Sequence, residues 1–169
     1  MLSNSTIKNQ IGIESVEHFE LQSRAEGVSP IDHSFSMSRL LVDGVAIDDT
    51  EIVGHTINKQ FKVRNHFLLF TNWGCTYEKN IEVTLLDSNY RVIDNRSIEW
   101  PDDTVKLEAV VASTQDVFEL HFSNGRVYDL KMRLSIFNSI FVNSILPFAR
   151  KLGLMPGLLP FRPLYLKSR

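Results

Sequence analysis

Cysteine is nearly absent from this 169-residue sequence, and the motifs of several common functional classes are missing with it. The single cysteine, Cys75, excludes an internal disulfide framework and a metal site built from several thiolates. The eight glycines are scattered, so there is no glycine-rich phosphate loop. The five histidines form no i,i+4 pair and no His-x-His motif. We therefore predict no metal and no cofactor.

Long apolar runs are also missing. The longest uncharged stretch, residues 134–149, is shorter than the roughly 20 apolar residues that a spanning helix needs, and it contains Pro147. The first ten residues lack the apolar core of a secretory signal. We therefore expect a cytoplasmic protein, and one free cysteine is compatible with that compartment.

Acidic residues are absent after Asp129. Residues 1–129 carry 20 acidic and 11 basic residues, a net charge of −9, whereas residues 130–169 carry seven bases and no acid. The overall charge of −2 therefore combines an acidic body with a basic end. The bases nearest the C-terminus, taken together as a candidate interaction segment, are Arg150, Lys151, Arg162, Lys167 and Arg169.

Three roles for this basic end compete. It docks on the acidic body, it meets an anionic membrane surface or nucleic acid, or it is a plain basic terminus. Phosphate binding favours dense lysine and arginine with polar spacers, whereas these bases are sparse and separated by apolar residues. Nucleic acid is therefore the weakest of these partners, and we predict that none is bound.

Period-two alternation between apolar and polar residues, with turn residues at close intervals, runs from about residue 35 to 134 and predicts antiparallel strands. We expect a meander of about eight or nine strands that forms a barrel or a sandwich, and the fold class is mainly β. The expected strands are 35–42, 45–48, 56–63, 66–71, 78–86, 90–98, 104–112, 116–122 and 126–134.

Two hairpins have a predictable register. Asp43-Gly44 is a type I′ signal, and a two-residue loop there pairs Val42 with Val45, Leu41 with Ala46, Leu40 with Ile47 and Arg39 with Asp48. Asn124-Gly125 invites the same interpretation, but a two-residue loop would set Leu120 opposite Asp129. A three-residue loop, 123–125, sets Leu120 opposite Tyr128 and Phe118 opposite Leu130, so we prefer it.

The two ends of the chain show different patterns. Apolar residues among glutamates predict a short amphipathic helix within 13–25, inside an N-terminal region 1–34. Apolar residues at three- and four-residue steps predict a second helix from about 137 to 152, followed by an extended, proline-rich tail. We expect 35–134 to be the β domain, with 135–169 packed on it in a single globular unit.

Candidate binding residues fall into two groups. Trp73 and Tyr77 flank Gly74 between two expected strands, and Trp100 joins them if the strand ends coincide; aromatic residues at turns are common binding anchors. Asp48, Asp49 and Glu51 form a cluster of carboxylates that could bind a cation or serve as an acid/base pair. Each group has a plain structural alternative, a capped core or a solvated loop. Cys75 has candidate bases in His55 and His66, but a small buried cysteine is more often packing.

These observations lean away from an enzyme. The first hypothesis is a non-catalytic protein-binding module, such as an inhibitor or immunity-type protein, whose acidic surface binds a basic partner protein. The second is a small-ligand-binding β-barrel, with or without catalytic activity. The third is a peripheral membrane protein in which 136–166 inserts at the membrane surface.

Overall fold

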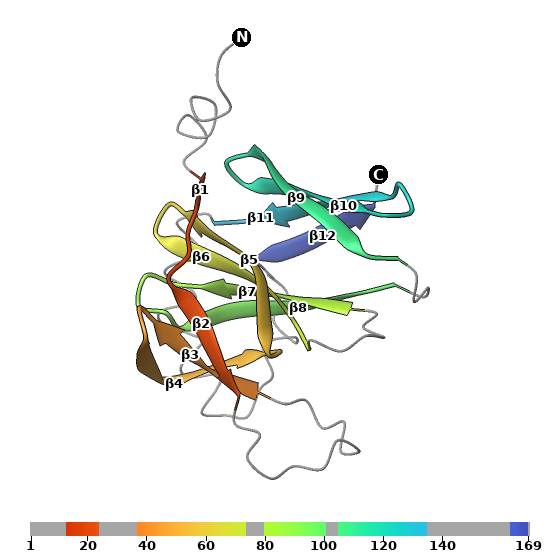
Figure 1. Cartoon of the computed structure of the whole chain (residues 1–169). Helices are drawn as coiled ribbons and strands as arrows, with labels where there is room; N and C mark the ends of the chain where they lie inside the picture. The colour runs from red at the N-terminus through yellow and green to blue at the C-terminus, as the bar shows by residue number, and fades with distance from the viewer. Residues whose placement is uncertain (1–12, 24–36, 74–79, 101–104, 135–162, 169) are drawn as a thin grey trace, which may run out of the picture. The chain divides into compact units, whose positions relative to one another are not determined.

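A computed structural model describes residues 13–23, 37–73, 80–100, 105–134 and 163–168 of the chain (Figure 1). These residues form twelve strands in three sheets, every pairing is antiparallel, and none of them is helical. The prediction of a mainly β, antiparallel fold is confirmed. The finer expectation of one meander of eight or nine strands differs from the structure, in which twelve described strands divide among three sheets. Among these strands, each sheet has two edge strands and none closes into a barrel.

The nine strands expected between residues 35 and 134 correspond in order to β3–β11. The largest difference is β4, which runs five residues beyond its expected end. The strand bounds are β1 Ile13–Ser15, β2 Phe19–Ser23, β3 Met37–Val42, β4 Val45–Val53, β5 Thr56–Val63, β6 His66–Asn72, β7 Asn80–Leu86, β8 Val92–Glu99, β9 Leu107–Thr114, β10 Val117–Phe122, β11 Val127–Met132 and β12 Leu164–Ser168.

Residue contacts divide the chain into two compact units, Met1–Val105 and Lys106–Arg169. The first unit holds a five-stranded sheet in the order β1-β5-β6-β7-β8 and a three-stranded sheet in the order β2-β3-β4. The second unit holds a four-stranded sheet in the order β12-β11-β10-β9. The expected boundaries near residues 34 and 134 stay a prediction.

The core of the first unit lies between its two sheets (Figure 1). Phe67, Leu69 and Leu86 alternate on one face of the five-stranded sheet and pack against apolar residues that come mainly from the three-stranded sheet. Phe19 and Phe67 meet edge to face, with ring centroids 5.0 Å apart. Each such buried side chain contributes about 1.5–3 kcal/mol to folding. The residues supplied to this core by the segment 16–52 are Val16, Phe19, Leu40, Val42 and Ile52.

The predicted N-terminal helix is wrong, because residues 13–23 form the two short strands β1 and β2. Gln60 on β5 decides the path between them. Its side-chain oxygen accepts from the Phe19 amide at 3.0 Å, its side-chain nitrogen donates to the Phe19 carbonyl at 3.2 Å, and its backbone carbonyl accepts from the Val16 amide at 3.2 Å. Tertiary partners therefore satisfy backbone groups that a helix would have bonded internally.

The second unit confirms the three-residue loop. Leu120 lies opposite Tyr128 and Phe118 opposite Leu130, and Gly125 has φ +76°. The end of the tail is strand β12, which pairs with β11 so that Leu164 lies opposite Met132. Leu164 is fully buried. The predicted helix over 137–152 falls outside the described residues.

Candidate functional site

The β3–β4 hairpin contains a large β-bulge that holds two of the three predicted acidic residues, Asp48 and Asp49, both of them exposed. The Asp43-Gly44 turn has φ values of +51° and +79°, and it pairs Val42 with Val45 as predicted. Beyond Leu41 the ladder shifts, and Arg39 lies opposite Glu51. The predicted pairs Leu40 with Ile47 and Arg39 with Asp48 are therefore wrong. Leu40 faces the four residues 47–50, which is three more than a regular ladder would place there.

Two tertiary contacts fix the shape of this bulge. The Thr50 hydroxyl, on a side chain that is only 4% exposed, donates to the Tyr90 carbonyl at 3.1 Å. Ile47 packs against the core between the sheets, as Tyr90 does. Tyr90 itself lies in the β7–β8 turn, where one Asp87 carboxylate oxygen accepts from the amides of Asn89 and Arg91 at 2.8 and 2.9 Å. The bulge therefore rests on a well-bonded turn and has a defined conformation.

The carboxylates of the hairpin point to solvent. Asp43, Asp48 and Asp49 are exposed, and in the described part of the chain none of the three makes an ion pair. Glu51 is half-buried and lies opposite Arg39, the only basic residue of β3 and β4. The hairpin therefore carries three exposed aspartates that no ion pair with another described residue neutralises. We call Asp43, Asp48 and Asp49 the acidic hairpin surface.

An exposed aliphatic side chain accompanies these charges. Val45, next to the turn, is 66% exposed, the highest value among the large apolar residues that the structure describes. Asp49 has φ +60°, a conformation that aspartate tolerates better than most residues, and this turns the chain at the bulge. A surface with exposed carboxylates and one accessible valine can contact a basic surface through side chains.

The predicted aromatic site is only partly described. Trp73 is half-buried directly after β6, and its ring meets that of His55 edge to face at 5.8 Å. Trp100 is half-buried directly after β8. Tyr77 and Cys75 lie outside the described residues. A shared aromatic binding site therefore stays a prediction.

A serine–histidine contact lies beside Trp73, and sequence reasoning missed it. Ser38 Oγ is 3.2 Å from His55 Nδ1 and donates to the Gly54 carbonyl at 2.6 Å. Because Ser38 is fully buried and its proton is already committed to Gly54, the hydroxyl is not placed to attack a substrate. The hydrogen-bond network assigns the Nδ1 proton to His55, which then donates to Ser38 Oγ. The contact fastens β3 to the segment between β4 and β5.

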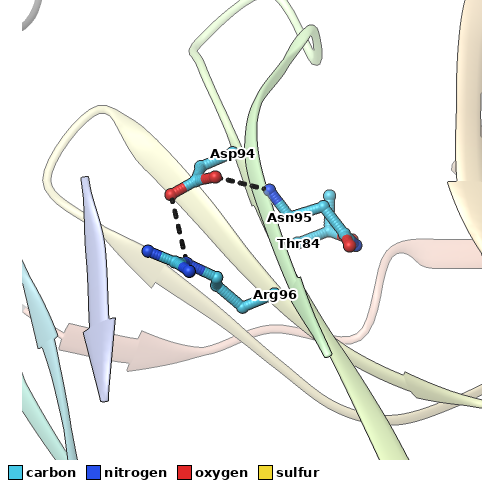
Figure 2. Close-up of polar contacts among 4 residues, drawn as sticks. All are labelled: Thr84, Asp94, Asn95 and Arg96. Carbon is cyan, nitrogen blue, oxygen red and sulfur yellow. Dashed lines mark hydrogen bonds and ion pairs between the residues drawn. The ribbon is translucent and has the colours of Figure 1, made fainter. Parts of the chain in front are cut away.

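A second polar cluster lies on edge strand β8 (Figure 2). The Asp94 carboxylate accepts from the Asn95 amide at 3.0 Å and lies 4.0 Å from Arg96 Nε, while Asn95 Nδ2 donates to Thr84 Oγ1 at 2.9 Å. Asp94 and Arg96 share one face of the sheet, and Asn95 and Thr84 share the other. The cluster pairs a carboxylate with a guanidinium, so its charges largely cancel and it offers no net charge to a ligand.

The predicted basic segment is described only at Lys167, which lies on β12 opposite Asp129. Nearby, the Arg133 guanidinium carbon is 5.3 Å from the centre of the Tyr165 ring, a cation–π geometry. Arg150, Lys151, Arg162 and Arg169 lie outside the described residues. A role for the basic segment in binding stays a prediction.

Among the residues that the structure describes, no group of three His, Cys, Asp or Glu side chains is arranged to hold a metal ion. In the same residues there is no helix of the length and apolarity needed to cross a membrane.

Comparison with protein-family models, with curated proteins and with solved structures finds no match to this chain. A function must therefore be argued from the surface chemistry alone.

Proposed function

We propose that this protein is a non-catalytic protein-binding module whose acidic hairpin surface binds a basic partner protein. The observation that carries the proposal is the three-residue excess on β4, which places the exposed Asp48 and Asp49 in a bulge of an edge strand, where neither makes an ion pair with another described residue. An inhibitor or immunity-type protein is the specific example we propose, because such proteins neutralise a partner by covering a charged surface.

The bulge also suits recognition through side chains. A regular edge strand presents unpaired backbone amides and carbonyls that can pair with any other strand, whereas bulges and charges at an edge oppose such pairing. On β4 the bulge and the two aspartates lie in the middle of the strand, so a partner is held by charge. Electrostatic attraction of this kind raises the association rate and gives specificity.

The test compares two double variants with the same change in charge. Asp48→Asn/Asp49→Asn removes charge from the acidic hairpin surface, and Glu17→Gln/Glu99→Gln removes it from exposed glutamates elsewhere. The immobilised protein is exposed to native cell extract, and captured proteins are quantified at about 0.05 and 0.5 M salt, conditions that differ strongly in screening.

We expect the wild-type protein and the glutamine variant to capture the same basic protein at low salt. The asparagine variant should lose at least tenfold of that capture, and high salt should release it. Capture that is equal for both variants, or insensitive to salt, would contradict the proposal.

A second candidate is contact with an anionic membrane surface through residues 136–162. Leu164 pairs with Met132, and the Arg133 amide donates to the Pro163 carbonyl at 2.8 Å, so the intervening acid-free segment begins and ends at one point of the sheet. Leu164 and Leu166 belong to β12. The expected membrane segment 136–166 is therefore shortened at its C-terminal end, before β12. Co-sedimentation with phosphatidylserine vesicles, for the full chain and for a variant with a short Gly-Ser linker replacing 136–161, decides this candidate. Equal sedimentation of the two proteins excludes it.

A further inference from the structure

The six edge strands of the three sheets differ in how they are protected against pairing with another strand. Charged residues interrupt β1, β2, β4, β8 and β12, and none of these five contains more than three consecutive uncharged residues. In contrast, β9 has a single charge, Glu108 at its second position, followed by six uncharged residues to Thr114. Natural edge strands are usually guarded by charge, proline or bulges.

The ends of β9 are guarded, but its centre is not. The ladder with β10 shifts at two places, so that Glu108 and Ser113 are the extra residues on β9. Between them, Ala109, Val110, Val111 and Ala112 pair regularly with β10. Val111 is 46% exposed, and no described strand pairs with the other edge of β9. This regular, uncharged run offers backbone donors and acceptors to an additional strand.

We propose that β9 is a self-association edge, at which a second copy of this chain adds its own β9 in antiparallel orientation. A two-fold axis perpendicular to a continuous sheet keeps each residue on its own face, and here it lies midway between the Val111 residues of the two copies. Val111 then lies opposite the same residue of the second copy, and Val110 lies opposite Ala112. Two partly exposed valines become each other's cross-strand neighbours, a pairing that favours strand association.

The charge pattern of β9 is compatible with itself in this register. Glu108 lies opposite Thr114 of the second copy, so the only charged residue of the strand never faces its own copy. The acidic edge β4 fails the same test, because a self-pairing through its middle would bring Asp48 and Asp49 of both copies together. A second copy is therefore the occupant that the strand itself is best suited to accept. This dimer is independent of the acidic hairpin surface.

Sedimentation of the full chain tests the proposal. The weight-average mass should rise from 19.4 kDa toward twice that value as concentration increases from about 1 µM to about 1 mM, the behaviour that mass action gives a short strand interface. Val111→Lys should weaken self-association at least tenfold, because it places two ammonium groups opposite each other. Val45→Lys, which changes an even more exposed valine on another edge, is the matched control and should associate like the wild type.

A cross-linking experiment keeps the proposal testable if a lysine variant folds poorly. In a Cys75→Ser background, Val111→Cys should form an intermolecular disulfide on mild oxidation, since opposed residues of antiparallel strands have Cα atoms about 4.5–5.5 Å apart, within disulfide reach. Val45→Cys in the same background should not form one at the same rate. A wild-type protein that stays monomeric to about 1 mM, or equal cross-linking of both cysteine variants, overturns the proposal.

Discussion

Gly54 is the position at which substitution should reveal most about how the first unit is built. It lies between β4 and β5, where the chain leaves the three-stranded sheet and enters the five-stranded sheet. Its φ of +105° lies outside the left-handed helical region that other residues occasionally adopt. A Cβ atom there would be 2.9 Å from the Asn72 carbonyl oxygen and 3.1 Å from Thr71 Cβ.

The expected cost of Gly54→Ala has two parts. The strained backbone conformation contributes about 1–3 kcal/mol. The clash adds to this, because the Asn72 carbonyl accepts from the His55 amide at 2.7 Å and Thr71 Oγ1 donates to the Val53 carbonyl at 2.6 Å. Weakening these two bonds costs about 1 kcal/mol each. We therefore expect the free energy of unfolding to fall by about 3–5 kcal/mol.

Gly44 supplies the matched control. It also has positive φ, +79°, but no atom lies within 4 Å of the position that its Cβ would occupy. Gly44→Ala should therefore cost only the conformational term, about 1–2 kcal/mol. Urea unfolding of both variants, followed by circular dichroism, measures the difference. If Gly54→Ala is no more destabilising than Gly44→Ala, the close approach of the two sheets at this corner does not limit stability.

Three further changes test other parts of the structure. Burial, with a smaller contribution from Arg64 and against the opposing effect of Asp87, lowers the pKa of His66 below its usual 6.5, so the unfolded chain binds this proton more readily. The free energy of unfolding should therefore decline as pH falls below about 6.5. The urea midpoints measured at pH 7.5 and at pH 5.5 should differ less for His66→Gln than for the wild type. Equal differences in the two proteins would count against this role of His66. Gln60→Met removes both side-chain hydrogen bonds to the Phe19 backbone. It should lower the urea midpoint and speed hydrogen exchange of the Phe19 amide. Unchanged exchange would show that β2 is held by packing alone. Phe118→Ala empties a fully buried site and should cost about 3–5 kcal/mol by the same assay; a loss below about 1 kcal/mol would mean that the second unit repacks around it.

Local patterns were sufficient for the pairs nearest each turn. The alternation in residues 116–133 excludes a two-residue loop, which would place Leu120 and Leu130 on opposite faces, and the structure has the three-residue register, in which both are buried. The Asp43-Gly44 turn likewise determines the first two pairs of its hairpin. A one-residue slip would invert every side chain, so such patterns are strongly restrictive.

The same reasoning failed where a distant residue decides the conformation. Residues 13–23 have an apolar spacing compatible with a helix, but Gln60 binds the Phe19 backbone and directs the segment into two strands. The predicted hairpin extended a regular ladder to Arg39 opposite Asp48, but Thr50 binds Tyr90 and the bulge rests on the β7–β8 turn. Asp48 and Asp49 were predicted as candidates, yet nothing local indicated that they would lie on a bulge.

The amino-acid pattern alone established the mainly β class, most strand positions, two hairpin turns and the concentration of acidic residues before Asp129. These features depend on side-chain periodicity and turn geometry, which act over a few residues. Only the tertiary structure decided that the strands divide into three sheets and that β12 joins β11. Backbone hydrogen bonds do not depend on side-chain identity, so a strand can pair with any compatible edge, and the choice depends on which apolar faces can be buried together.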